Sequence, residues 1–278
     1  MNTIWKRVGS NEKFTGVWRY VAVITGLMLT GTVAQAAVLG SRHDLGGAGQ
    51  AQQTTTATTE VCVFCHTPHG AQTNASVPLW NKRLQQPAGG YTRYSTLNTS
   101  TLDGTEAPVG SVSLACLACH DGTQAMDVVI NAPGRGGYNA AGAELDAAGI
   151  SAMTGAPIPM LGSDLANDHP ISIQYGGGGC TDANPGCTLR DGDFQIPANA
   201  VINNVRQWWI NTTGGTANRE RADIILYTRT DVNGQVGTVQ PSVECGSCHD
   251  PHNEVAQPVQ FMRISNANSA VCLACHIK

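Results

Sequence analysis

The chain has 278 residues, of which 41% are hydrophobic and only 5% aromatic, and its formal net charge is -4 at pH 7. Four of its 16 basic residues and one of its 20 acidic residues precede residue 37, so the remainder carries 12 Lys and Arg against 19 Asp and Glu. An acidic chain with few basic side chains argues against nucleic acid and anionic membranes as partners.

The first 36 residues have the organisation of an export signal. A basic segment precedes an apolar stretch from Tyr20 to Val33, and Ala34-Gln35-Ala36 fits an A-x-A cleavage site. The alternative is an uncleaved membrane anchor, but the apolar stretch is short for a span and contains several Thr and Gly. We therefore expect residues 37–278 to form an exported domain without a membrane span, either periplasmic or extracellular.

The motif Cys-x-x-Cys-His occurs four times and dominates the sequence. This spacing is the attachment signature of c-type haem, in which two thiols bond to the porphyrin edge and the adjacent His binds the iron. Zinc sites, redox dithiols and structural disulfides are alternatives, but none of them requires His directly after the second Cys. We therefore predict four covalently attached haem c groups, held by Cys62, Cys65 and His66, by Cys116, Cys119 and His120, by Cys245, Cys248 and His249, and by Cys272, Cys275 and His276.

The motifs divide the chain into unequal segments. Residues 37–60 are small and polar and predict an irregular lead-in that carries His43. The first two motifs lie in residues 61–125, a segment without haem motifs covers residues 126–240, and the last two motifs lie in residues 241–278. Because four haems would share a short chain, we predict a mostly irregular coil fold with few short helices and a small β-hairpin, organised around a stacked haem chain.

The segment without haem motifs contains three local signals. We expect a short helix around Ala200 to Ile210, and a β-hairpin over Ile224 to Val239 that turns at Asn233-Gly234. Cys180 and Cys187 flank a turn-forming sequence, and in an oxidising compartment they predict a disulfide that closes this loop. A redox-active thiol pair is the alternative.

The number of His residues matches the number of axial positions on four irons. The motifs supply four of the eight ligands, and the chain has four other His: His43, His69, His169 and His252. We therefore predict two imidazoles on every iron, with the Met residues serving in packing rather than as ligands. Such irons have no open position for substrate, which favours an electron carrier over an enzyme.

The spacing of the additional His residues restricts their pairing. His69 follows His66 by three residues, and His252 follows His249 by three. Neighbours at this spacing cannot bind opposite faces of one iron, so we expect the second His of each pair to serve a different haem. His169 lies in Asp168-His169-Pro170, where Asp168 could orient the imidazole.

Several stretches around the motifs, read in order, resemble a known family. They are Cys65-His66-Thr67-Pro68-His69-Gly70, Pro78-Leu79-Trp80-Asn81, Cys119-His120-Asp121-Gly122-Thr123, Asp168-His169-Pro170-Ile171, Cys248-His249-Asp250-Pro251-His252-Asn253 and Leu273-Ala274-Cys275-His276. Over most of residues 41–276 the chain resembles the tetrahaem cytochromes that polymerise into extracellular filaments, nanowires of the OmcE type. The Gly-rich loop with Cys180 and Cys187 departs from that family.

The resemblance implies a largely coil fold around a continuous haem chain, head-to-tail subunits, and one axial His supplied by the neighbouring subunit. His43 is the residue that we expect in that last role. Three hypotheses follow: a filament-forming electron-transfer protein that exchanges electrons with partner cytochromes, a monomeric carrier with the same haems, and a reductase of nitrogen or sulfur oxyanions. The reductase would require an open iron.

Overall fold

The structure is a computed structural model that describes most of the chain after the predicted export signal. The described residues are 38–47, 49, 51–134, 136–146, 149–154, 159–214, 218–253 and 261–277. The predicted signal, residues 1–36, lies outside them. None of the helices within these ranges is both long enough and apolar enough to cross a membrane.

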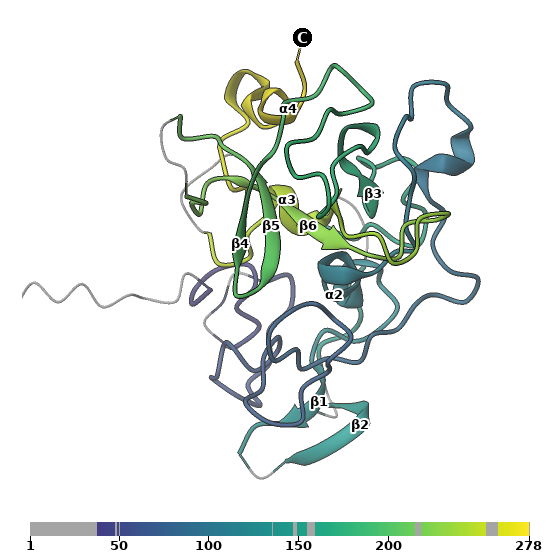
Figure 1. The fold of residues 1–278 in the computed structure, drawn as a ribbon. Helices are drawn as coiled ribbons and strands as arrows, with labels where there is room; N and C mark the ends of the chain where they lie inside the picture. The colour runs from purple at the N-terminus through teal and green to yellow at the C-terminus, as the bar shows by residue number, and fades with distance from the viewer. Residues whose placement is uncertain are drawn as a thin grey trace, which may run out of the picture. The chain divides into compact units, whose positions relative to one another are not determined.

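Two antiparallel sheets lie mainly in the segment without haem motifs (Figure 1). The smaller sheet pairs β1 (Val128–Ala132) with β2 (Gly137–Glu144). The larger sheet has the strand order β3-β7-β6-β5-β4, and each neighbouring pair is antiparallel. Its strands are β3 (Ile173–Gln174), β4 (Ala198–Ile202), β5 (Val205–Ile210), β6 (Ile224–Arg229) and β7 (Gln240–Val243).

The prediction of a mostly irregular fold is wrong. Aromatic residues make up only 5% of the whole chain. That average concealed a local concentration, since Trp208 and Trp209 are adjacent on β5 and both are buried. Trp208 packs with Tyr175, Leu226 and other buried side chains into a hydrophobic cluster. Strand-favouring residues on β5 and β6 therefore bury apolar side chains in the larger sheet.

The predicted helix over residues 200–210 is also wrong. These residues form parts of β4 and β5, which pair in the register Ile202↔Val205 through Ala198↔Trp209. Asn203 and Asn204 connect the strands with φ values of 51° and 61°. Two successive left-handed residues form the tight turn that matches strand twist, and Asn tolerates this conformation well. Val and Ile on either side then favour strands over a helix.

The predicted hairpin over residues 224–239 is right in its first strand and its turn. β6 begins at Ile224, and Gly234 adopts a φ of 72° in a turn in which Gln235 N–H donates to the Val232 carbonyl. The returning strand β7 starts only at Gln240, so the turn lies within a longer connection rather than directly between the strands.

Three short helices carry the last three haem motifs. They are α2 (Ser111–His120), α3 (Cys245–Cys248) and α4 (Ala270–Cys275). The first motif lies in turns, where His66 N–H donates to the Cys62 carbonyl at 2.8 Å. A helical or turn conformation places both thiols of Cys-x-x-Cys on one side of the backbone. The fourth motif is anchored to the sheet, because Val271, Ala274 and Cys275 pack against the Trp208 cluster.

Three single-turn 3-10 helices complete the described secondary structure: η1 (Tyr94–Leu97), η2 (Tyr175–Gly177) and η3 (Ala267–Ser269). The predicted disulfide between Cys180 and Cys187 is confirmed, with Cα atoms 4.7 Å apart. Both cysteines are buried in the Trp208 cluster. The loop between them is held to the sheet because Arg206 Nε of β5 donates to Asp182 at 2.7 Å. The disulfide therefore fixes a loop to the sheet core.

Candidate functional site

The first and second haem motifs lie side by side. Cys65 and Cys119 both pack against the hydrophobic cluster that contains Phe64. Burial raises the pKa of Cys65 to about 11, and the nearby Cys119 adds to the rise. A thiol with such a high pKa is protonated at neutral pH, whereas metals bind the thiolate. The contacts of Cys65 therefore place the first and second motifs next to each other.

The second and third motifs meet directly. The thiols of Cys116 on α2 and Cys245 on α3 are joined by a hydrogen bond, which raises the pKa of Cys116 and lowers that of Cys245. These are the first cysteines of their motifs. The second and third motifs are therefore in contact through their first cysteines.

The third and fourth motifs are neighbours as well. Burial raises the pKa of Cys275 to about 12, and Cys248 of the third motif contributes to this rise. Cys248 is likewise influenced by Cys272 of the fourth motif. The four motifs therefore follow one another in space in the same order as along the chain. None of their cysteines forms a disulfide.

Backbone carbonyls orient the His residues of the first two motifs. Nδ1 of His66 lies 2.7 Å from the Pro78 carbonyl oxygen, and Nδ1 of His120 lies 2.8 Å from that of Pro159. A carbonyl can only accept, so Nδ1 carries the proton in each ring and Nε2 is left as the donor to a metal. Such a contact fixes the ring orientation and increases the basicity of the ligand.

Two pairs of imidazoles have the separation that one iron requires. The ring centres of His66 and His252 are 6.1 Å apart with 16° between the planes, and those of His120 and His43 are 6.2 Å apart with 81°. An imidazole nitrogen binds a metal at about 2.0 Å and lies roughly 1.1 Å from its ring centre, so two rings on opposite faces of one iron are roughly 6 Å apart. The residues of the first two motifs therefore fit a bis-imidazole haem.

His252 is held by an acidic neighbour. Its Nδ1 lies 3.5 Å from Oδ1 of Asp250, and this contact is the main reason that the pKa of Asp250 is lowered. Arg221 holds Asp250 and His252 together. Its Nε donates to the Asp250 carboxylate at 2.9 Å, and its Nη2 donates to the His252 carbonyl. Because Nδ1 contacts the carboxylate, Nε2 of His252 is the nitrogen left for a metal. His252 follows the third motif yet faces the His of the first, as ligation of a different haem requires.

His43 lies inside the chain rather than on a free arm. Its ring stacks on Phe261 with centres 4.2 Å apart and lies next to His120 of the same chain. Burial, followed by repulsion from His120, lowers the pKa of His43 to about 4. The ring is neutral at physiological pH, which is the form that binds metals. Its place beside His120 makes His43 a candidate second ligand for the iron of the second motif, and the expected role in a neighbouring subunit stays a prediction.

The structure leaves the remaining two candidate ligands at the surface. His69 is exposed, and its carbonyl is anchored by Asn131 of β1 at 2.7 Å. His169 is also exposed, and its Nδ1 lies 3.0 Å from the carbonyl of Pro170 rather than against Asp168. That contact leaves Nε2 of His169 available to a metal.

Sequence reasoning missed the residues that orient the ligands. Pro78 and Pro159 act through backbone carbonyls, which any residue type could supply, so no sequence pattern indicates them. Phe261 meets His43 only through the tertiary fold. Asp250 is the one such residue that the sequence could have indicated, because the side chain of an acidic residue two positions before a His can reach the imidazole ring. Of the Met residues assigned to packing, Met126, Met153 and Met262 are buried, whereas Met160 is 37% exposed.

Comparison with known proteins bears on the end of the chain. Residues 239–278 match the family model described as the doubled CXXCH motif. The motifs point to a multihaem c-type cytochrome. The match covers the third and fourth motifs of the cytochrome, which the structure places on α3 and α4. No curated protein matches the chain.

Proposed function

We propose that this cytochrome is an exported electron-transfer protein with four bis-His haems that assembles head to tail into a filament. Haem iron held by two imidazoles supplies reversible one-electron transfer. The observation that carries the proposal is the pair of imidazole separations, 6.1 Å for His66–His252 and 6.2 Å for His120–His43. Two filled faces on an iron leave no position for substrate, which speaks against a reductase.

The serial arrangement of the motifs supports transfer along the whole chain. Cys65 lies near Cys119, Cys116 lies against Cys245, and Cys248 lies near Cys275. Each step between motifs is therefore short, and none skips a neighbour. A carrier that only shuttles one electron would not need four centres in a line. A row of four haems could exchange electrons at each of its ends, with partner cytochromes or with further copies of the chain.

The positions of the two ends favour a head-to-tail contact. His69 is tied by Asn131 to β1, and β1 and β2 lie far from α4, which carries the last motif (Figure 1). An exposed imidazole beside the first motif and a haem site at the opposite end are complementary features of two copies. A contact between different surfaces propagates without closing and gives a fibre. His69 is thus the imidazole that we expect to bind an iron of the next copy.

The purified protein offers the first test of this function. We expect four haems per chain by pyridine haemochrome absorbance, a wholly low-spin ferric spectrum, and no binding of carbon monoxide to the reduced protein, since every iron has two imidazole ligands. A high-spin signal in the parent protein, or rapid binding of carbon monoxide at one haem per chain, would overturn bis-His ligation and restore the reductase hypothesis.

Replacing His69 tests the filament. In His69→Ala the contact between copies loses a metal bond. We therefore expect cryo-electron micrographs to show no filaments and light scattering to give the mass of a single subunit. His169→Ala is the matched control, because it removes another exposed imidazole and is expected to leave filaments intact. Filaments that persist in His69→Ala, or disappear only in His169→Ala, contradict the assignment. A parent protein that is monomeric at all concentrations contradicts the filament itself.

A further inference from the structure

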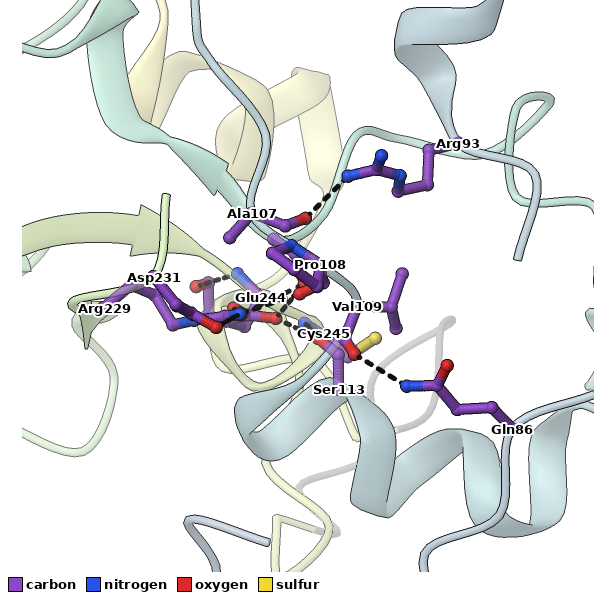
Figure 2. A network of polar contacts seen from close by, with 12 residues as sticks. Gln86, Arg93, Ala107, Pro108, Val109, Ser113, Arg229, Asp231, Glu244 and Cys245 are labelled. Atoms are coloured by element: carbon purple, nitrogen blue, oxygen red, sulfur yellow. Dashed lines mark hydrogen bonds and ion pairs between the residues drawn. The ribbon is translucent and has the colours of Figure 1, made fainter. Parts of the chain in front are cut away.

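A buried polar network joins the two helices that carry the second and third motifs (Figure 2). Ser113 lies on α2, one turn before Cys116, and its hydroxyl donates to Oε2 of Glu244 at 2.5 Å. The same hydroxyl oxygen accepts the backbone N–H of Cys245 at 2.9 Å. Ser113 and Glu244 are both almost fully buried. One hydroxyl group therefore bridges α2 and the first residue of α3.

Arg229, at the end of β6, uses every donor of its guanidinium in this network. It donates to Glu244 at 2.5 Å, to both carboxylate oxygens of Asp231 at 2.8 Å, to the Pro108 carbonyl at 2.7 Å and to the Ser172 hydroxyl at 3.3 Å. Five N–H groups in a rigid planar fork admit little displacement. Pro108 lies just before α2, so Arg229 fixes the start of that helix relative to Glu244 (Figure 2).

Glu244 also determines where α3 begins. It is the N-cap residue of the helix, its side chain accepts from the backbone of Ser247, and the Ser247 hydroxyl accepts from the Glu244 backbone at 3.0 Å. Its Oε2 accepts a further hydrogen bond from Ser172 at 3.1 Å. Burial raises the pKa of Glu244, while Arg229 and the two hydroxyls favour the carboxylate. The carboxylate thus places a negative charge between two haem attachment sites.

The network fixes the point at which these two motifs touch. Cys116 follows Ser113 by one helical turn and Cys245 follows Glu244 directly, so the hydrogen bonds of Ser113 to Glu244 and to the Cys245 backbone fix the two cysteines relative to each other. We propose that Ser113 and Glu244 are positioning residues for electron transfer, which fix the separation and orientation of the haems on the second and third motifs. This inference rests on the proposed function.

A hydrogen-bonded network is better suited to this task than apolar packing. Buried ion pairs contribute little net stability compared with well-packed apolar side chains, and their best-attested use is to specify one arrangement. Each contact here depends on direction as well as distance, so a shift of α2 against α3 breaks several bonds at once. The Glu244 charge would in addition oppose electron uptake by both haems, through direct electrostatics.

The test compares two pairs of substitutions in the haem-loaded full chain. Ser113→Ala removes the bridging hydroxyl, and Glu244→Gln removes the charge while keeping the shape. The matched controls are Ser95→Ala and Glu106→Gln, because Ser95 donates to Glu106 at 2.5 Å and Arg93 pairs with it at 3.5 Å. Glu106 is buried like Glu244, and its carboxylate contacts Ser95 and Arg93.

Two readouts separate positioning from folding. Electron paramagnetic resonance of the ferric protein reports magnetic coupling between neighbouring irons, and haem methyl signals in nuclear magnetic resonance follow each haem through stepwise oxidation. We expect Ser113→Ala to weaken the coupling of one neighbouring pair of irons without loss of haem or of low-spin ligation. We expect Glu244→Gln to shift the potentials of two haems upward, because a negative charge near them is removed. Both controls should match the parent protein.

Parent-like coupling and potentials in Ser113→Ala and Glu244→Gln would overturn the inference, as would equal changes in the controls. If Glu244→Gln does not accumulate as folded protein, Ser113→Ala decides alone, since it leaves the ion pair with Arg229 in place. Failure of the proposed function has a different signature: the parent protein would then contain fewer than four haems or show high-spin iron before any substitution is made.

Discussion

Replacing His252 with alanine is expected to convert one low-spin iron per chain to a high-spin iron that binds carbon monoxide. The ring of His252 is 6.1 Å from that of His66, so the substitution removes the imidazole that faces the His of the first motif. The ferric spectrum and the stoichiometry of carbon monoxide binding measure this change. His43→Ala should open the iron of the second motif in the same way, because His43 faces His120.

Two further variants make the result specific. Arg221→Ala removes the guanidinium that donates to Asp250 but leaves the imidazole of His252, so it should stay low-spin. Combining His43→Ala with His252→Ala should open two irons per chain, since the two residues face different motifs. One open iron in the double variant would mean that both His residues serve the same haem, and a wholly low-spin His252→Ala would remove His252 from the set of ligands.

Replacing Arg229 with methionine is expected to lower the free energy of unfolding by about 3–5 kcal/mol, because it leaves the buried Glu244 carboxylate without a counter-ion. The side chain of Arg229 is 5% exposed and that of Glu244 is fully buried. Denaturant unfolding of the haem-loaded chain measures the loss. Arg206→Met is the control: Arg206 pairs with Asp182, whose side chain is 55% exposed, and an exposed pair of this kind contributes at most about 1 kcal/mol.

The loss in Arg229→Met should depend on pH in a defined direction. Burial already raises the pKa of Glu244 above its ordinary value, and removing Arg229 takes away the main opposing influence. A carboxyl group whose pKa is higher in the folded than in the unfolded state favours folding below the unfolded pKa, about 4.3 for Glu, and this contribution is lost as pH rises through the folded pKa. The difference in the free energy of unfolding between the parent protein and Arg229→Met should therefore grow from acid towards neutral pH. A deficit that is independent of pH, or abolished at neutral pH, would contradict this account.

Haem attachment and the disulfide are local features, and the sequence was sufficient to predict both kinds of site. Two thiols and a His within five residues share one turn of backbone, so their chemistry does not depend on the remainder of the fold. Cys180 and Cys187 are similarly close along the chain and flank a turn, and the structure joins them. The number of imidazoles relative to motifs is likewise a property of composition, and it indicated which His residues were candidates.

The sheets were harder to predict than the motifs because their stability comes from contacts between distant segments. β3 and β7 pair although they lie far apart in sequence, and Trp208 is buried by residues from η2, β6 and α4. Chain-wide averages of aromatic content cannot reveal such a cluster. The Asn203-Asn204 pair is a turn signal in the sequence. The two segments that flank it are short and largely apolar, and such segments can be read as either strand or helix, so they were mistaken for a helix.

The order of the residues was enough to identify the groups that can hold haem: four pairs of thiols, each followed by an imidazole, and four further imidazoles. The folded chain was needed to show which imidazole faces which motif, that consecutive motifs are neighbours, and that Ser113 and Glu244 join two of them. The difference lies in the range of the interactions. Covalent attachment needs a few adjacent residues, whereas two ligands on opposite faces of one metal come from segments that only folding brings together.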